Sequence, residues 1–388
     1  MAAISKPGIN SASLREIWQR LHDLCAAQNW CGYDPYDGLN SPLARFLYLR
    51  TTPIFPRFHN DAHYEEFTIR RLRPQTPFWH TSLDGQWEFR INAQGFRADK
   101  NDDYEKPPGC QRVLCLGDSQ TEGFECRQEH TVSAIIERYF AVRRKCVEAI
   151  NTGVSGFGTA EELVLLENEG VKFHPDFVVL VFFGNDLEDN TRCDIFGVKN
   201  GALVTNTTTY IPGVKIPNRI DSFALLRWLS QYSYLYSRGV NGVWEYERSR
   251  LETQNERKLT SEMAVQNTNT TTYVAVYQKD LEATLLRRMC ACCQAHGAKL
   301  IILDIPELVD PSRPSPDFKP SIPPDLRDTF RQNCDVLIES EPTQAEYRGS
   351  IAMHVPHGHY HMSEEGHLLF GIQAAKAMER LAEKKPGS

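Results

Sequence analysis

Apolar and polar residues follow one another in blocks along the chain from about residue 110 onward. Three short segments, 113–116, 177–183 and 299–305, are almost wholly apolar, which is typical of strands buried on both faces of a sheet. Segments with the pattern of an amphipathic helix alternate with them. These are 130–145, 159–169, 281–295 and 364–384. The alternation predicts an α/β protein, a three-layer α/β/α sandwich around a mostly parallel sheet.

Two regions break this rhythm and suggest how the chain is divided. Residues 1–105 are aromatic and rich in proline after a helical stretch at Leu14–Ala27, so we expect an N-terminal extension or small subdomain packed on the domain 106–388. Residues 191–278 are too long for an ordinary connection and form an insertion, with a hairpin turn predicted around Asn200. Two interpretations of the insertion stay open, a lid over a site or a structural elaboration or dimer face.

Helix boundaries are also visible in the sequence. Thr159 and Glu162 have the spacing of a capping box, and Gly170 ends the same segment. This predicts that Thr159 is the N-cap of the helix and that the Glu162 side chain accepts a hydrogen bond from the Thr159 amide.

Composition excludes several classes of protein. Of 388 residues, 41% are hydrophobic and 24% charged, enough for a large core. The 43 Lys and Arg against 50 Asp and Glu give a net charge of −7, so we expect no nucleic-acid partner. The longest apolar run, Phe177–Phe183, is far below the roughly 18 residues that span a bilayer. The first residues contain no apolar stretch of a signal peptide, which favours a cytoplasmic location.

The cysteines do not have the spacing of a disulfide framework. There are 11 of them, an odd number, at irregular intervals. The densest group, Cys290–Cys293, lies in a predicted helix without a second ligand pair. We therefore expect small buried thiols.

Polar residues follow the predicted strands at the edge where parallel α/β sheets form their sites. Ser119 lies in Gly-Asp-Ser after the first strand, and Asn185 lies in Gly-Asn-Asp after 177–183. Gly153 and Gly156 occupy a glycine-bearing loop after another strand. A serine here can act as a nucleophile, and glycine amides and an asparagine amide can bind an oxyanion. Each motif alone is also explained as a turn or a helix cap.

Histidines are concentrated near the C-terminus. Five of the 12 lie within fourteen residues, at His354, His357, His359, His361 and His367. If 357–361 were a strand, His357, His359 and His361 would share a face and could bind zinc. A histidine-based metalloenzyme is therefore an alternative, although it leaves the serine, glycine and asparagine segments unexplained.

Taken together and in this order, the four segments resemble those of the SGNH hydrolases, the GDSL-type esterases and lipases. The resemblance covers roughly residues 90–190 and 280–380, and 91–100 is similar to the Asn-x-x-Gly-Phe-Arg lead-in of one bacterial subgroup. It implies a flavodoxin-like fold with Ser119 as nucleophile and His361, six residues before His367, as base. It further implies an oxyanion hole from the amides of Ser119 and Gly156, with Gly153 as second choice, and the side chain of Asn185.

The resemblance implies a serine esterase that hydrolyses or transfers an O-acyl group, with acetyl on a carbohydrate as the expected substrate and neither metal nor cofactor. The family's acid is missing from its usual places, which hold Gly358 and His359. His359 and Asp304, with Glu307 beside it, are the candidate orienting groups, and a Ser-His dyad is the other solution. An inactive binding module of the same fold is the alternative function. The acyl group, the acceptor and the oligomeric state stay open.

Overall fold

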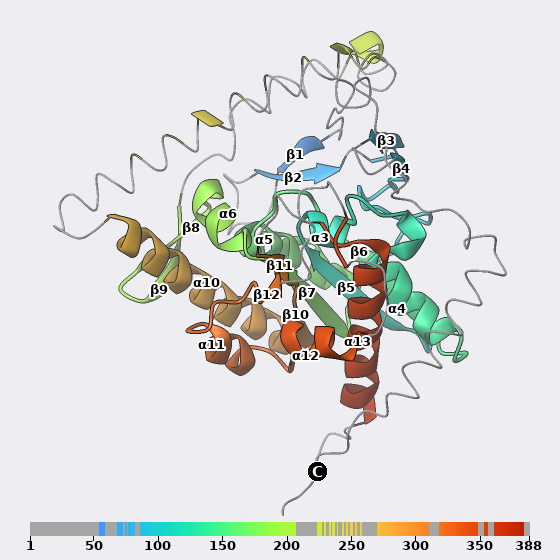
Figure 1. Cartoon of the computed structure of the whole chain (residues 1–388). Coiled ribbons are helices and arrows are strands. Elements are labelled where there is room, and N and C mark those ends of the chain that lie inside the picture. Colours follow the sequence, from blue (N-terminus) through green and yellow to red (C-terminus); the bar gives the residue numbers. More distant parts are fainter. Residues whose placement is uncertain are drawn as a thin grey trace, which may run out of the picture.

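The computed structural model describes residues 54–58, 68–72, 74–75, 77–81, 86–206, scattered positions between 223 and 257, 270–309, 318–347, 353–355 and 361–383 (Figure 1). The helix predicted at 14–27 and most of the insertion lie outside these residues. Among the described helices, none is long and apolar enough to cross a membrane.

One five-stranded sheet forms the centre of the molecule. Its strands are β5 (Gln111–Gly117), β6 (Val147–Asn151), β7 (Phe177–Phe182), β10 (Lys299–Asp304) and β13 (Val336–Ile338). They lie in the order β13-β10-β7-β5-β6, and every neighbouring pair is parallel. This is the flavodoxin-like order, and it confirms the predicted mostly parallel sheet.

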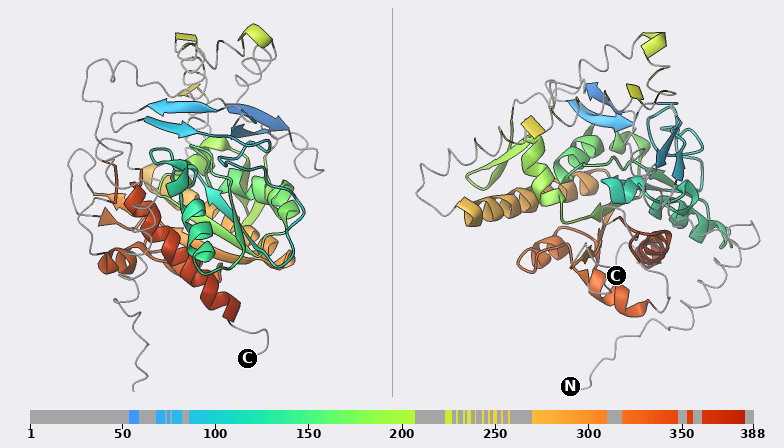
Figure 2. Two further views of the ribbon diagram at one scale, coloured as in Figure 1. Left: turned by 90° about the vertical axis from the view of Figure 1, so that its right-hand side faces the viewer. Right: turned by 45° about the horizontal axis from the view of Figure 1, so that its top comes forward.

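Helices cover both faces of the sheet (Figures 1 and 2). On one face α4 (Val132–Ala141) packs beside α13 (Glu364–Glu383). On the other, α5 (Thr159–Asn168) packs beside α10 (Thr270–Ala295) and α6 (Asp186–Cys193). The result is the predicted three-layer sandwich.

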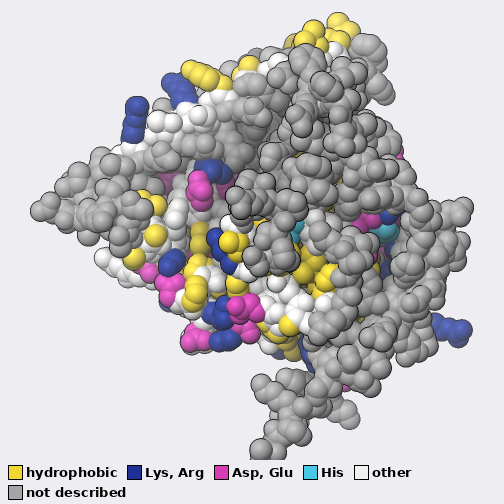
Figure 3. All heavy atoms as spheres, viewed as in Figure 1, with side chains coloured by type: hydrophobic (Ala, Val, Ile, Leu, Met, Phe, Trp, Pro, Cys, Tyr) yellow, Lys and Arg dark blue, Asp and Glu magenta, His cyan; other side chains and the backbone are white. Residues whose placement is uncertain are grey.

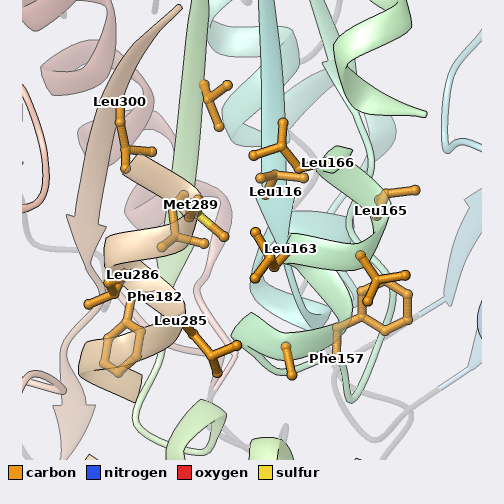
Figure 4. Close-up of a cluster of buried hydrophobic side chains, with 14 of the residues drawn as sticks. Leu116, Phe157, Leu163, Leu165, Leu166, Phe182, Leu285, Leu286, Met289 and Leu300 are labelled. Carbon is orange, nitrogen blue, oxygen red and sulfur yellow. The ribbon is translucent and has the colours of Figure 1, made fainter. Parts of the chain in front are cut away.

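Strand alternation divides the core into two clusters. In β7, Val178 and Leu180 join the cluster beneath α5 and α10, whereas Val179 and Val181 join the one beneath α4 and α13. Figure 4 shows the first cluster, in which Leu163 of α5 and Leu285 of α10 face the sheet. Both faces of β7 are therefore dry, which explains why its sequence is an unbroken apolar run.

The predicted capping box of α5 is wrong by one residue. The helix begins at Thr159 with Gly158 as its cap, and the Glu161 carboxylate accepts from the Gly158 amide at 3.3 Å. The Thr159 hydroxyl instead donates to Glu282, and Glu162 is fully buried. The spacing of Thr159 and Glu162 fits a capping box, but the sequence could not show that Glu282 of helix α10 would accept the hydrogen bond of the Thr159 hydroxyl.

Smaller elements surround the sandwich. Two antiparallel pairs come from the N-terminal region, β1 (Ile54–Phe58) with β2 (Thr68–Leu72) and β3 (Phe78–Thr81) with β4 (Gln86–Phe89). The hairpin predicted around Asn200 is confirmed by β8 (Phe196–Lys199) and β9 (Ala202–Thr205). The remaining elements are α3 (Ser119–Glu122), η1 (Gln128–His130), η2 (Gly170–Phe173), β11 (Glu307–Leu308), β12 (Phe318–Lys319), α11 (Arg327–Gln332) and α12 (Ser340–Glu346).

Charges of both signs lie next to one another on the face that Figure 3 shows, over α11, where Arg331 pairs with Asp328 and Glu339.

One disulfide, which the sequence did not predict, joins Cys110 to Cys146 beside the first residues of β5 and β6. Cys290, Cys292 and Cys293 are free thiols, but only Cys293 is buried as expected, and the other two are partly exposed.

Candidate active site

Ser119 lies at the carboxyl edge of the sheet, where β5 ends and the short helix α3 begins. The residue before it, Asp118, caps α3 by accepting from the Gln120 amide at 2.8 Å. Ser119 is the first residue of that helix, a position whose amide has no acceptor within the helix. The serine is half-buried, so its hydroxyl and amide are held at the surface of the sheet edge.

His361 faces this serine from the other end of the chain. Its Nε2 atom lies 2.8 Å from Ser119 Oγ. A short antiparallel bridge between His354 and Met362 holds the backbone, and the Met362 amide donates to the Gln120 side chain at 2.9 Å. His361 is therefore fixed to the same helix that carries the serine.

The other ring nitrogen of His361 contacts a third side chain, the carboxylate of Glu125. His361 Nδ1 lies 3.2 Å from Glu125 Oε2. Glu125 is 1% exposed and follows α3 after a tight turn at Gly123, whose φ of 72° is left-handed. The sequence did not single out Glu125, although a lone carboxylate between the apolar residues Phe124 and Cys126 was a usable signal.

The ionisation of Glu125 determines what His361 can do. Burial alone would raise the pKa of this carboxyl, but the imidazoles of His361 and His80 outweigh burial and hold its pKa well below the ordinary value. An ionised Glu125 can only accept, so the proton of a neutral His361 lies on Nδ1. Nε2 is then a hydrogen-bond acceptor for the Ser119 hydroxyl, the arrangement that a general base requires.

Ion pairs connect the segments that carry Glu125 and His361. Glu364, at the start of α13, accepts from the Arg127 amide at 3.0 Å and from Arg127 Nε at 2.7 Å. Its other oxygen contacts the Nδ1 atom of His130. Burial opposes ionisation, yet Arg127 and His130 lower the pKa of Glu364 to about 2. The loop that follows Glu125 is thereby attached to the helix that follows His361.

The lead-in segment 91–100 acts as a support for the same loop. Asn92 Oδ1 accepts from the Phe96 amide at 2.9 Å and shapes the turn that aims Arg97 inward. The buried Arg97 guanidinium donates to the carbonyls of Glu122 at 2.9 Å and Cys126 at 2.8 Å, on either side of Glu125. Arg97 therefore positions the carboxylate without touching it.

The glycine loop after β6 lies against α3. A side chain on Gly153 would place its Cβ 2.2 Å from the Glu122 amide nitrogen, so close packing requires glycine there. Gly156 has a φ of 76°, which favours glycine for a different reason. The buried Glu122 carboxylate accepts from the Ser155 amide at 2.7 Å and from its hydroxyl. This contact fixes the backbone next to Gly156.

Asn185 lies close to Ser119, but its side-chain amide already donates to two carboxylates. Nδ2 donates to Asp118 at 3.1 Å and to Asp189 at 2.8 Å. Because Asp118 precedes Ser119, the amide is held next to the serine. An oxyanion would have to compete with the Asp118 carboxylate for one of these N–H groups.

Of the predicted orienting groups, Asp304 is wrong. Its Oδ1 accepts from the amides of Ser321 and Ile322, and its Oδ2 accepts from the Ser340 hydroxyl at 2.8 Å. Asp304 thus connects the end of β10 to two following segments and does not contact His361. Glu307 forms an ion pair with Lys319 at 2.7 Å. His359 lies outside the described residues.

Two other histidines of the C-terminal group, His354 and His367, are described, and both are buried. His367 is fully buried, and burial together with Arg97 lowers its pKa to about 3. His354 contacts the Pro306 carbonyl through Nε2, at 2.8 Å. Within the described residues, no three His, Cys, Asp or Glu side chains are grouped to hold a metal ion. His361 directs its nitrogens at Ser119 and Glu125, which favours a base over a zinc ligand.

No protein-family profile matches the chain, and no curated protein does. Several solved structures are similar to it. The lipase/acylhydrolase from Enterococcus faecalis is 15% identical, with 72% of this chain and 99% of that chain covered and a TM-score of 0.33. A GDSL-like lipase from Bacteroides thetaiotaomicron is 13% identical, covers 70% and 89%, and has a TM-score of 0.34. A two-domain esterase active on acetylated mannans is 11% identical, covers 71% and 51%, and has a TM-score of 0.36.

Proposed function

We propose that the protein is a serine esterase whose catalytic triad is Ser119, His361 and Glu125. The observation that carries the proposal is the chain of contacts from Ser119 Oγ to His361 Nε2 at 2.8 Å and from His361 Nδ1 to Glu125 Oε2 at 3.2 Å. The alternative of an inactive binding module was based on the absence of an acid beside His361. In this proposal Glu125 is that acid, so the alternative loses its support.

In the proposed reaction, Ser119 Oγ attacks the ester carbonyl carbon while its proton passes to His361 Nε2. Glu125 stabilises the imidazolium without taking its proton. His361 then protonates the leaving alcohol as the C–O bond breaks, which leaves an acyl group on Ser119. Water, activated by the same histidine, hydrolyses this acyl-enzyme, and an acceptor hydroxyl in its place gives acyl transfer.

The oxyanion donors in this proposal are the amides of Ser119 and Gly156 and the side chain of Asn185. The position of Ser119 at the start of α3 and the anchoring of Ser155 by Glu122 support the two amides. For Asn185, the attachment to Asp118 and Asp189 keeps the amide plane beside the serine. Loss of one such donor typically costs about 10²–10³ in kcat.

For the substrate, we propose an acetyl ester on a carbohydrate. This finer statement is supported by the resemblance of the lead-in segment 91–100 to that of one bacterial subgroup, and it predicts that short acyl chains are preferred over long ones. Release of acetate from acetylated oligosaccharides, compared with hydrolysis of acetyl and decanoyl p-nitrophenyl esters, tests it. Faster hydrolysis of the decanoyl ester would favour a lipid substrate.

The test of the function itself is Ser119→Ala. We expect hydrolysis of p-nitrophenyl acetate to fall by about 10⁶ in kcat, as when a triad serine is removed. Since the variant removes a single hydroxyl from a half-buried residue, we expect the melting temperature to stay nearly unchanged. A fluorophosphonate, which forms an Oγ–P bond and releases fluoride, should label the wild type on the peptide that contains Ser119. A Ser119→Ala variant with a tenth of wild-type activity would contradict the proposal.

A further inference from the structure

The β3–β4 hairpin brings a second imidazole to the catalytic carboxylate. His80 Nε2 lies 3.8 Å from Glu125 Oε1, the oxygen that His361 does not contact. Both side chains are almost fully buried, at 0% and 1% exposed. Within the described residues Glu125 Oε1 has no hydrogen-bond partner, and the nearby nitrogen of His80 is the group able to supply one.

The position of His80 is fixed by its neighbours. Its ring centroid lies 3.9 Å from that of Phe124, and Phe124 in turn lies 5.1 Å from the ring of His361. Across the hairpin, His80 pairs with Trp87, whose ring stacks on it at 5.9 Å. Aromatic rings therefore pack against the imidazole of His80 and limit how it can turn.

The hairpin is attached to the Glu125 loop by Arg97. This guanidinium donates to the Glu88 carbonyl of β4 at 3.2 Å and to the Cys126 carbonyl at 2.8 Å. It also lies over the Phe89 ring, 3.7 Å from the centroid. A segment from the N-terminal region and the loop that carries the acid are thus held together by one buried cation.

We propose that His80 is a positioning residue of the active site, which donates Nε2–H to Glu125 Oε1 and so holds the carboxylate in the orientation that His361 requires. This inference rests on the proposed function. It makes the hairpin 78–89 part of the catalytic apparatus rather than an accessory to the fold. The distance of 3.8 Å is longer than a hydrogen bond, and we expect a small movement of the two side chains to close this contact when an ester occupies the site.

The experiment measures how fast a fluorophosphonate labels Ser119 at saturating probe, and the probe concentration that gives half that rate. These two quantities need no knowledge of the natural ester. The variants are His80→Phe, which keeps an aromatic ring without a donor, and His80→Gln, which restores an N–H. Tyr139→Phe is the control, since it removes one buried hydroxyl, which donates to Glu379 at 2.8 Å, from helix α4 outside the hairpin.

We expect His80→Phe to lower the maximal labelling rate about tenfold, the effect of losing a hydrogen bond to a charged group, with the half-saturating concentration unchanged. His80→Gln should recover most of the rate, and Tyr139→Phe should keep it. Thermal melts of each variant show whether it is folded. If His80→Phe does not fold, His80→Leu takes its place as the variant without a donor, and a tenfold loss there without a loss of melting temperature supports the proposal.

A double-mutant cycle separates positioning from general stabilisation. If His80 acts through Glu125, changing it in a Glu125→Gln background should cause no further loss. An equal loss in both backgrounds, or a wild-type rate for His80→Phe, would overturn the inference. Failure of the proposed function is recognised separately, because then the wild type itself would not be labelled or Ser119→Ala would react equally well.

Discussion

Two glutamates with the same burial lie in opposite electrostatic surroundings. Glu125 is 1% exposed and Glu162 is fully buried. Glu125 faces two imidazoles, and its pKa lies far below the ordinary value although burial opposes this. Glu162 has no hydrogen-bond partner on either oxygen within the described residues, and burial followed by the charge of Asp118 raises its pKa well above the ordinary value.

The difference shows that partners, rather than burial, decide which buried carboxylates are charged. Glu162 belongs to a group of acids that meet behind Ser119, with Asp118, Asp186 and Glu282. Burial raises the pKa of Glu282 to about 7 and that of Asp118 to about 6. The raised pKa values mean that these acids keep their protons to a higher pH than free carboxyls, whereas Glu125 keeps a negative charge.

The largest effect that tests this comparison is the loss of the imidazole between Glu125 and Ser119. His361→Ala should lower kcat by about 10⁶, as much as Ser119→Ala, because residues that act as a unit are not additive. Steady-state hydrolysis of a short acyl ester measures it, with the double variant as the control. If the double variant is much slower than either single one, the two residues do not form a unit.

The next effect concerns the clamp that places Glu125. Arg97→Gln removes most of the donors to the carbonyls on either side of the carboxylate and leaves them buried. We expect a loss of about 3–5 kcal/mol in the free energy of unfolding, because several buried acceptors lose their partner. Urea denaturation measures it. An unchanged midpoint would mean that the loop is held by other contacts.

A smaller effect is expected at Asp304, the acid that the sequence suggested and the structure places elsewhere. Asp304→Asn weakens the contacts to Ser321, Ile322 and Ser340 and should cost about 1–3 kcal/mol of stability. Because Asp304 does not contact His361, kcat should stay at the wild-type level. A large fall in kcat without a fall in melting temperature would return Asp304 to the site.

The smallest effect is a gain. Since the pKa of Glu162 is raised in the folded state, its contribution to stability is complete below the unfolded value of about 4.3 and is lost as the pH rises through the folded value. Glu162→Gln should remove this dependence and stabilise the protein by about 1 kcal/mol at alkaline pH, with less effect under acid conditions. Melting temperatures across the pH range check the sign. A gain confined to acid conditions would show that Glu162 is ionised in the fold.

Much of the scaffold was predictable from local pattern. The unbroken apolar run of β7 and the alternating strands and helices follow from burial on both faces. Ser119 was singled out because it lies in a short motif directly after such a strand, and His361 because the family resemblance places the base six residues before His367. Ser119 lies at a strand end, and the segment before α13 is held against α3 by the Met362 amide, which donates to the Gln120 side chain, so residues 242 positions apart in the chain are in contact.

The acid was not predictable in the same way. Glu125 reaches His361 because a four-residue helix and a left-handed glycine reverse the chain directly after the nucleophile, and no periodic pattern records such a turn. His80 depends on a hairpin whose sequence has no clean period and on Arg97, a tertiary contact. Glu162 was misassigned as a cap for a related reason, since helix α10 decided what α5 would bury.

The most direct test of the account compares Glu125→Gln with Glu162→Gln in one assay of kcat. Glutamine at 125 keeps the shape but can donate to Nδ1, which favours the wrong tautomer of His361, so we predict a fall of about 10⁴ in kcat with the fold intact. Glutamine at 162 should leave kcat at the wild-type level. Equal activity of the two variants, or a larger loss for Glu162→Gln, would contradict the assignment of Glu125 as the catalytic acid.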